Sequence, residues 1–297
     1  YRKAAIQGHT LSQASLGGMY ARGEGVSKDY QKAAKWSRKA AVAGNRNAQN
    51  QLGKLYEKGR GVPQDYETAV KWYRKAVIDG ITKGNQLAQF NLANCYSNGN
   101  GVERNLQKAL KWYRKSAEQG FVLAEYQLGL LYNYGLGKAT KDINKALKWY
   151  RKAAEQGHVI SQYNLGLLYE RGKGVPQNDS KAVKWWRKAA EQGHASAQYN
   201  LGVMYDQGNG IPRNYSKTVK WYRKAAEQGD AGAQYNLGLM YGKGKGIPQN
   251  YSKAVKWYRE AAEQGHVIAQ LNLGVMYDQG KSVPQNYSNA VKWYRKA

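Results

Sequence analysis

The 297-residue sequence has one cysteine, two phenylalanines and five prolines, and its 20 acidic residues face 47 lysines and arginines. A single cysteine excludes an intramolecular disulfide framework and every metal site built from several cysteines. No apolar run approaches the roughly 18 residues that span a bilayer. The hydrophobic content of 42% is nevertheless enough to bury a core, which argues against a disordered chain.

Tryptophan recurs along the chain at intervals close to 36 residues. Five of the seven intervals are 36 residues long, and one interval of 40 is explained by an insertion at 81–84, after the helix-ending Gly80. A period of 20–50 residues is typical of solenoids and arrays, in which one unit cannot bury its apolar face alone. Only Trp186 lies outside the series Trp36, Trp72, Trp112, Trp149, Trp185, Trp221, Trp257 and Trp293.

Each unit carries the signals of two helices, and the fifth unit serves as the example. Leu165, Leu168 and Tyr169 lie at positions i, i+3 and i+4, which predicts an amphipathic first helix, called helix A. The pair Gly172 and Gly174 favours a left-handed stop after it. A second helix, called helix B, runs through the repeat tryptophan and ends at the glycine before the next helix A. The sequence therefore predicts an all-α array of antiparallel helix pairs.

The repeated frame reads Ala/Ser-x-x-x-Leu-Gly-x-x-Tyr-x-x-Gly-x-Gly-Val, followed by Tyr-x-Lys-Ala-x-x-Trp-x-x-Lys-Ala-Ala-x-x-Gly. This frame resembles the Sel1-like repeat, a relative of the tetratricopeptide repeat. The resemblance implies a right-handed α/α superhelical solenoid of helix-turn-helix repeats. We expect residues 1–297 to form a single array, a fragment of a longer protein, in which residues 1–8 end a preceding repeat. The expected repeats are approximately 9–44, 45–80, 85–120, 121–157, 158–193, 194–229, 230–265 and 266–297.

The sequence offers no constellation for catalysis or metal binding. Gly-x-Gly turns such as residues 23–25 follow a helix, whereas a dinucleotide-binding loop follows a strand. Cys95 takes a position where other units have Leu or Met, so we expect a buried small hydrophobe. We therefore expect no enzyme, no cofactor and no metal. The histidines directly follow the helix B glycine, which favours a helix N-cap or loop role for His9, His158, His194 and His266.

The surface of helix A opposite its Leu/Tyr stripe is the first candidate binding surface. In the related tetratricopeptide family, the matching positions line a concave groove that grips peptides. Side-chain amides can pair with a peptide backbone, and tyrosine supplies rigid contact area. The alternative is that these tyrosines pack against the next helix A and that the asparagines satisfy neighbouring backbone groups. The candidate residues are Phe90, Asn91, Tyr126, Tyr163, Asn164, Leu167, Glu170, Tyr199, Asn200, Val203, Asp206, Tyr235, Asn236 and Asn272.

The outer face of helix B is the second candidate surface, because 29 of the 47 basic residues recur there at fixed positions around the repeat tryptophan. Such columns can attract nucleic acid, anionic lipid or an acidic protein. The alternative is a solvated face whose lysine and arginine stems cover the aromatic core. The candidate basic residues are Lys148, Arg151, Lys184, Arg187, Lys220, Arg223, Lys256 and Arg259.

We interpret the chain as a non-catalytic scaffold or adaptor that binds a partner protein or peptide, including an acidic one, on the concave helix A face. A nucleic-acid or anionic-surface binder that uses the basic columns is one alternative. An immunity or inhibitor protein for a bacterial toxin, which the family resemblance suggests, is another. We also expect the ends of the array to be able to stack on one another. The resemblance favours a periplasmic or secreted location.

Overall fold

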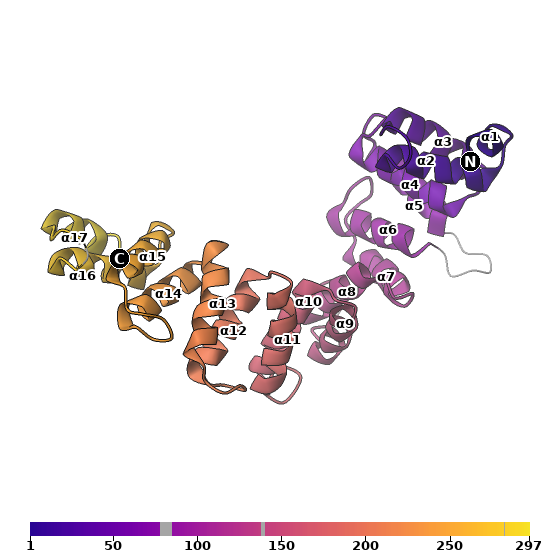
Figure 1. Ribbon diagram of the computed structural model, residues 1–297. Coiled ribbons are helices and arrows are strands. Elements are labelled where there is room, and N and C mark those ends of the chain that lie inside the picture. Colours follow the sequence, from indigo (N-terminus) through magenta and orange to yellow (C-terminus); the bar gives the residue numbers. More distant parts are fainter. Residues whose placement is uncertain (78–84, 138–139, 282) are drawn as a thin grey trace. The chain divides into compact units, whose positions relative to one another are not determined.

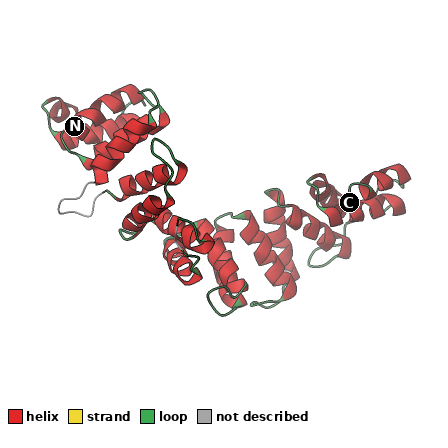
Figure 2. Ribbon diagram, turned by 180° about the vertical axis from the view of Figure 1, so that it is seen from behind, coloured by secondary structure: helices red, strands yellow, loops and turns green. Residues whose placement is uncertain are grey.

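The computed structural model describes residues 1–77, 85–137, 140–281 and 283–297, and their regular structure is entirely helical (Figures 1 and 2). The all-α fold expected from the sequence is confirmed. The insertion expected at 81–84 lies outside the described residues. Two compact units, Tyr1–Gln156 and Gly157–Ala297, are distinguished by their internal contacts, and each is described by itself.

The unit Tyr1–Gln156 alternates helices A and B in chain order. Its first helix, α1, occupies the position of a helix B, and each following pair consists of one helix A and one helix B. Every helix in the series packs on the next one along the chain. The helices are α1 (Arg2–Ile6), α2 (Thr10–Arg22), α3 (Tyr30–Val42), α4 (Arg46–Lys58), α5 (Tyr66–Val77), α6 (Gln86–Asn98), α7 (Leu106–Ala117), α8 (Val122–Tyr134) and α9 (Ile143–Glu155).

The unit Gly157–Ala297 holds four further helix pairs, and Figure 1 shows α12 and α13 as one such pair. Its helices A are α10, α12, α14 and α16, and its helices B are α11, α13, α15 and α17. The helices are α10 (Val159–Glu170), α11 (Asp179–Glu191), α12 (Ala195–Gln207), α13 (Tyr215–Glu227), α14 (Ala231–Lys243), α15 (Tyr251–Glu263), α16 (Val267–Gln279) and α17 (Tyr287–Tyr294).

Side-chain caps explain where the helices A begin. The His158 Nδ1 accepts a hydrogen bond from the backbone N–H of Ser161 at 3.2 Å, which satisfies one of the free donors of the first turn. Asn45 and Asp230 do the same with side-chain oxygens in their repeats. The N-cap role expected for the histidines is confirmed, since His9, His158, His194 and His266 all cap a helix A in this way.

The glycine turn between helix A and helix B is packed against the preceding repeat. Gly244 ends α14 in a left-handed conformation, and Gly246 has a φ of +70°. A Cβ added to Gly246 would lie 2.4 Å from the backbone carbonyl carbon of Tyr215, at the start of the preceding helix B. The turn therefore needs glycine both for its backbone conformation and for its close approach to a neighbouring helix.

The core consists of one leucine per helix A, surrounded by alanines and aromatic rings. Leu165 and Leu201 have no exposed surface. The glycine that follows this leucine is the point of closest helix contact, because a Cβ on Gly166 would lie 2.4 Å from the Trp186 ring. Cys95 is buried at a core position as expected, and burial raises the pKa of its thiol to about 12.

Candidate functional site

The tyrosines on the helix A face each pack against the following repeat. The Tyr163 ring stacks on the His194 ring with centroids 4.6 Å apart, and Tyr235 stacks on His266 at 4.7 Å. A Cβ added to Gly232, on the next helix A, would lie 3.2 Å from the Tyr199 ring, so the ring packs closely against this glycine. These tyrosines are half-buried. Part of each ring therefore packs against the next helix A, as in the alternative reading, and part stays open to solvent.

The asparagines beside these tyrosines interact with phenol groups. The side-chain amide of Asn200 forms a hydrogen bond with Tyr163, and that of Asn236 forms one with Tyr199. In each case burial raises the pKa of the tyrosine, and the hydrogen bond lowers it. Asn272 contacts Tyr258 of the preceding helix B in the same way. The asparagine ladder therefore links successive repeats, and every member of it is half-buried rather than fully exposed.

A hollow of about 360 Å³ opens on the helix A face between α10, α11 and α12. Its floor includes Trp186, and its rim includes Asp179, which replaces the tyrosine or aliphatic residue of other repeats. The side chains of Gln177, Gln207 and Asn209 add hydrogen-bonding groups. Five of the sequence-predicted residues line it together, namely Tyr163, Leu167, Glu170, Asn200 and Val203.

The remaining candidates lie at other places on the helix A face. Phe90 contacts the rings of Tyr113 and Phe121 at 5.7 and 5.1 Å, and the Asn91 Nδ2 donates to the Asn50 Oδ1 at 2.9 Å. Tyr126 packs on Tyr150 at 6.3 Å. Five other candidates are partly accessible but do not line the hollow that contains Tyr163, namely Asn164, Asp206, Tyr235, Asn236 and Asn272.

The arginines of the basic columns donate hydrogen bonds to the tyrosines of the following helix A. Arg187 donates to the Tyr205 hydroxyl at 3.2 Å, and Arg223 and Arg259 donate to Tyr241 and Tyr277 at 3.1 and 2.8 Å. The same bond joins Arg38, Arg74 and Arg114 to Tyr56, Tyr96 and Tyr132. The repetition of this bond indicates that the arginine column stabilises the stacking of repeats.

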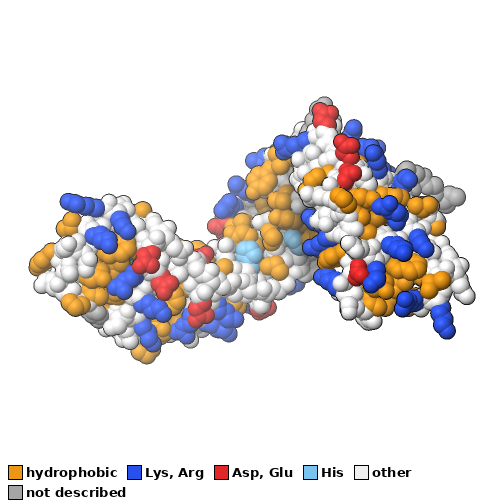
Figure 3. Space-filling model, turned by 90° about the horizontal axis from the view of Figure 1, so that it is seen from above, with side chains coloured by type: hydrophobic (Ala, Val, Ile, Leu, Met, Phe, Trp, Pro, Cys, Tyr) orange, Lys and Arg blue, Asp and Glu red, His pale blue; other side chains and the backbone are white. Residues whose placement is uncertain are grey.

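The lysines of the basic columns cover aromatic rings. The ammonium group three residues after the repeat tryptophan lies 4.6–5.1 Å from the tryptophan ring in seven repeats. Lys148, Lys220 and Lys256 lie within 5.4–5.9 Å of the adjacent tryptophan. Such contacts contribute about 0.5–1 kcal/mol each at exposed sites. On the face shown in Figure 3, the blue Lys and Arg side chains are spread among apolar and neutral groups rather than gathered into one patch.

A ladder of buried glutamines was missed in the sequence, although one glutamine recurs three positions before the leucine of every repeat except the fourth. Gln198 donates through its Nε2 to the carbonyl oxygen of Ala190 at 3.0 Å, and its Oε1 accepts from the Gln228 Nε2 at 2.7 Å. Gln234 makes the same two bonds, to the Ala226 carbonyl and from Gln264, so each of these glutamines joins two successive helices B across the helix A between them. The signal that reveals the ladder is a polar residue that recurs at this position in every repeat, on a helix face that is otherwise apolar.

Glu125 takes the ladder position in the fourth repeat and is almost fully buried. The Gln156 Nε2 donates to the Glu125 Oε2 at 2.8 Å, and burial raises the pKa of Glu125 while Lys152 lowers it. Because a buried carboxylate is most costly when charged, Glu125 contributes less to the stability of the fourth repeat at neutral pH than at a pH below its ordinary pKa of 4.5.

Glu125→Gln should therefore stabilise the protein at pH 7 by about 1–2 kcal/mol, since it removes the buried charge and restores the ladder donor. The gain should shrink as the pH falls toward 4.5, where the native carboxyl becomes neutral. Urea unfolding at pH 7 and pH 4 measures both values. The converse variant, Gln162→Glu, serves as the control and should destabilise the fifth repeat more at pH 7 than at pH 4. Equal effects at the two pH values would contradict a buried charge at this position.

In the described residues, no three His, Cys, Asp or Glu side chains lie close enough together to hold a metal ion. No helix among those residues has the length and apolar character needed to cross a membrane. Burial lowers the pKa of the capping histidines His158 and His194, which keeps them neutral and able to accept their cap bonds.

Comparisons with known proteins agree on one family. The Sel1 repeat model matches residues 10–45, 46–80, 86–121, 122–158, 159–194, 195–230, 231–266 and 267–297. The crystal structure of a Sel1 repeat protein from Oxalobacter formigenes is 35% identical, with a TM-score of 0.71 over 99% of this chain and 84% of that chain. A protective antigen of uropathogenic Escherichia coli is 33% identical, with a TM-score of 0.48 over 99% of this chain and 77% of that chain.

A more distant solved structure, an immunity protein from Pseudomonas aeruginosa, is 23% identical, with a TM-score of 0.39 over 75% of this chain and 84% of that chain. No curated protein matches the chain in sequence. Eight matched repeats, the all-helical fold and the Oxalobacter structure together show that the chain belongs to the Sel1 repeat family.

Proposed function

We propose that the chain is an interaction scaffold that holds a partner protein or peptide on the helix A face of residues 157–297. The observation that carries the proposal is the hollow between α10, α11 and α12, in which five sequence-predicted residues come together. As a Sel1 repeat protein, the chain belongs to a family that generally serves protein–protein interaction and is typically non-catalytic.

The chemistry of this hollow suits a peptide. Leu167 and Val203 offer apolar contact, Tyr163 offers a partly open ring, and Asn200 offers an amide. Glu170 and Asp179 add negative charge on the rim, which Arg171 offsets in part through an ion pair with Glu170 at 3.4 Å. A mixed surface of this kind can bind a segment with apolar side chains and hydrogen-bonding backbone groups.

Exposed apolar residues extend the same face to the last repeat. Leu271 and Val275, on α16, occupy the repeat positions of Tyr163 and Leu167 and are 42% and 38% exposed. Aliphatic side chains at these positions lose water contact when a partner covers them, which favours association by about 25 cal/mol per Å² of apolar surface. We infer that the partner contacts α16 as well as the hollow.

The alternative of a nucleic-acid or anionic-surface binder receives less support. Among the candidates, Arg187, Arg223 and Arg259 already bond to tyrosines. Lys148, Lys220 and Lys256 already lie near tryptophan rings. The basic columns therefore have a structural use that requires no ligand. No contact among the described residues singles out a toxin as the partner.

The proposal is tested with peptides selected from a random display library on the whole chain. Leu167→Glu combined with Val203→Glu should weaken the binding of a selected peptide at least tenfold, about 1.4 kcal/mol, in isothermal titration calorimetry. Both side chains are only half-buried, so the helices should persist, and circular dichroism checks this.

The control is the triple variant Lys184→Glu, Lys220→Glu and Lys256→Glu, which changes the helix B face alone. We expect this control to leave the affinity of the selected peptide within twofold of the parent. Loss of binding in the triple variant, with full binding in the helix A variant, would contradict the proposed surface and favour the basic columns.

A further inference from the structure

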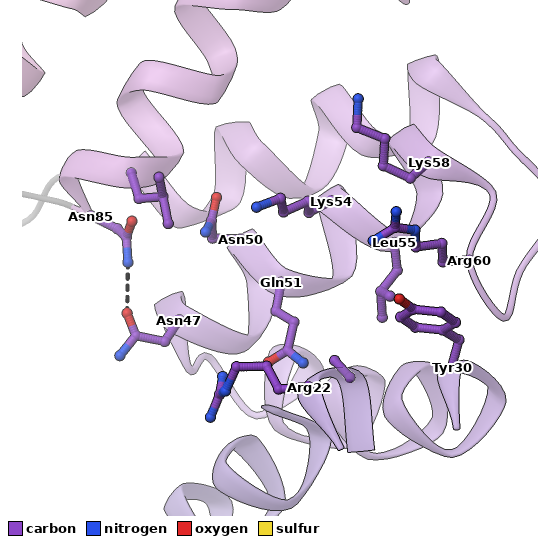
Figure 4. A pocket seen from close by; sticks show the side chains of 12 residues that line it. Arg22, Tyr30, Asn47, Asn50, Gln51, Lys54, Leu55, Lys58, Arg60 and Asn85 are labelled. Atoms are coloured by element: carbon purple, nitrogen blue, oxygen red, sulfur yellow. Dashed lines mark hydrogen bonds between the residues drawn. The ribbon is translucent and has the colours of Figure 1, made fainter. Parts of the chain in front are cut away.

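The unit Tyr1–Gln156 contains a second hollow, of about 430 Å³, on the helix A face between α2, α3, α4 and α6 (Figure 4). Two departures from the repeat distinguish its lining. Asn50 stands where later repeats have Tyr163, Tyr199 and Tyr235, and Lys54 stands where they have leucine or valine. This hollow therefore has a smaller and a charged side chain at positions where later repeats have a ring and an aliphatic group.

The hollow is lined by four basic residues and by no acidic residue. Arg22 pairs with Glu24 at 2.6 Å, and Lys58 pairs with Glu57 at 3.1 Å, both outside the lining. Lys54 and Arg60 have no carboxylate within ion-pair distance in the part of the chain that the structure describes. Figure 4 shows the Lys54 amine directed toward Asn50 and the Arg60 guanidinium beside Tyr30. Two unneutralised cations thus face the same space.

Amide groups add oriented donors to these charges. The oxygens of Asn47 and Asn50 are already used, because Asn85 donates to Asn47 at 2.6 Å and Asn91 donates to Asn50 at 2.9 Å. This arrangement leaves the Nδ2 groups of Asn47 and Asn50 as the atoms available to a ligand. Asn50 is 5% exposed as a residue, and no hydrogen bond donated by its Nδ2 is found among the described residues. A carboxylate that reaches this Nδ2 gains a charge-assisted hydrogen bond.

The apolar residues of the lining distinguish between classes of anion. Leu55, Leu87 and Ala21 provide aliphatic contact beside the cations. Arg60 lies 5.2 Å and Lys28 lies 5.3 Å from the centroid of the Tyr30 ring, so a base that stacked on this ring would compete with these cations. A nucleic acid would gain only its phosphate contacts here, whereas a peptide can place both carboxylates and aliphatic side chains.

We propose that this hollow binds an acidic segment of a partner protein, with side-chain carboxylates on Lys54, Arg60 and the Asn50 amide and aliphatic side chains against Leu55 and Leu87. Charge-assisted hydrogen bonds of this type are about twice as strong as neutral ones. The site lies in a different unit from the helix A surface of residues 157–297 and does not depend on the function proposed for that surface.

The test measures fluorescence anisotropy of three labelled probes with the full chain at about 150 mM salt, where long-range charge attraction is screened. The probes are the peptide Leu-Glu-Glu-Leu-Glu-Glu, its neutral counterpart Leu-Gln-Gln-Leu-Gln-Gln, and a twelve-nucleotide thymidine oligonucleotide. The acidic peptide should bind at least tenfold more tightly than either of the other two.

The key variant combines Lys54→Leu with Arg60→Asn, which installs residues that other repeats carry at these positions and should therefore fold. It should weaken the acidic peptide at least tenfold. The matched control, Lys173→Asn with Lys245→Asn, removes the same charge at the Arg60 position of two later repeats and should stay within twofold of the parent. Equal weakening by both variants, absence of peptide binding, or tighter binding of the oligonucleotide would each overturn the proposal.

Discussion

Gly246→Ala should lower the free energy of unfolding of its repeat by about 3 kcal/mol, in a range of roughly 2–5. The backbone of Gly246 has a φ of +70°, which costs a residue with a Cβ about 1–2 kcal/mol. The added methyl would also lie 2.4 Å from the carbonyl carbon of Tyr215, so the turn must move away from α13, at a further cost of about 1–3 kcal/mol. Urea unfolding and hydrogen exchange of α13 and α14 measure the loss.

Gly265→Ala is the matched control for this prediction. Gly265 also has a positive φ, +86°, but a Cβ added to it meets no atom within 4 Å. It should therefore cost only the conformational penalty of about 1–2 kcal/mol. Equal losses in the two variants would show that the contact with the preceding helix B contributes nothing, and that the turn glycines serve only the backbone conformation.

Gln198→Leu should destabilise the stack of α11, α12 and α13 by about 1–3 kcal/mol, because it leaves buried polar groups without partners. The side chain donates to the Ala190 carbonyl and accepts from Gln228, so its loss breaks the link between two helices B. Leucine has a similar volume, so packing alone predicts a small effect. Hydrogen exchange of α11 and α13 reports the local stability, which suits a repeat protein better than a single global value.

A double-mutant cycle with Gln228→Leu separates the two bonds of Gln198. The coupling between the variants should be about 0.5–1.5 kcal/mol, the usual net worth of one hydrogen bond. The part of the Gln198→Leu effect that persists when Gln228 is already leucine belongs to the Ala190 bond. A coupling near zero would contradict a role for the ladder in joining repeats.

The basic composition of the chain has a structural explanation. Arg187, Arg223 and Arg259 each bond to a tyrosine 18 residues later, and lysines lie over the repeat tryptophans. The charge that suggests a nucleic-acid binder from composition is thus distributed among contacts that hold the repeats. Lys54 of the hollow stands apart from this pattern, because it lies on α4 at a helix A position where later repeats have leucine or valine.

Part of the candidate site was predictable because it depends on repeat position. Tyr163 and Leu167 share a face of α10 by their spacing, Val203 takes the Leu167 position in the next repeat, and the structure brings the three to one hollow. The packing of Tyr163 against the next helix A was left as an alternative, because the rotation of one helix A relative to the next is not encoded in a local period; the structure shows this packing as a stacking on His194. Trp186 lies outside the tryptophan series of the sequence, but its place in the hollow, like that of Asp179, follows only from the packing of α11 on α10 and α12.

The sequence by itself determined the repeat, the two helices of each unit, the core leucines and the position of the histidines directly after the glycine that ends helix B. Those features rest on interactions within four residues or on a strict period, and both are visible in a single chain. The tertiary structure decided which polar groups meet across repeats, such as Gln198 with Gln228 and Arg187 with Tyr205. It also decided where the helix A face is hollow. Such contacts join residues 18 to 30 positions apart and depend on how neighbouring helices are offset and rotated, which no local pattern specifies.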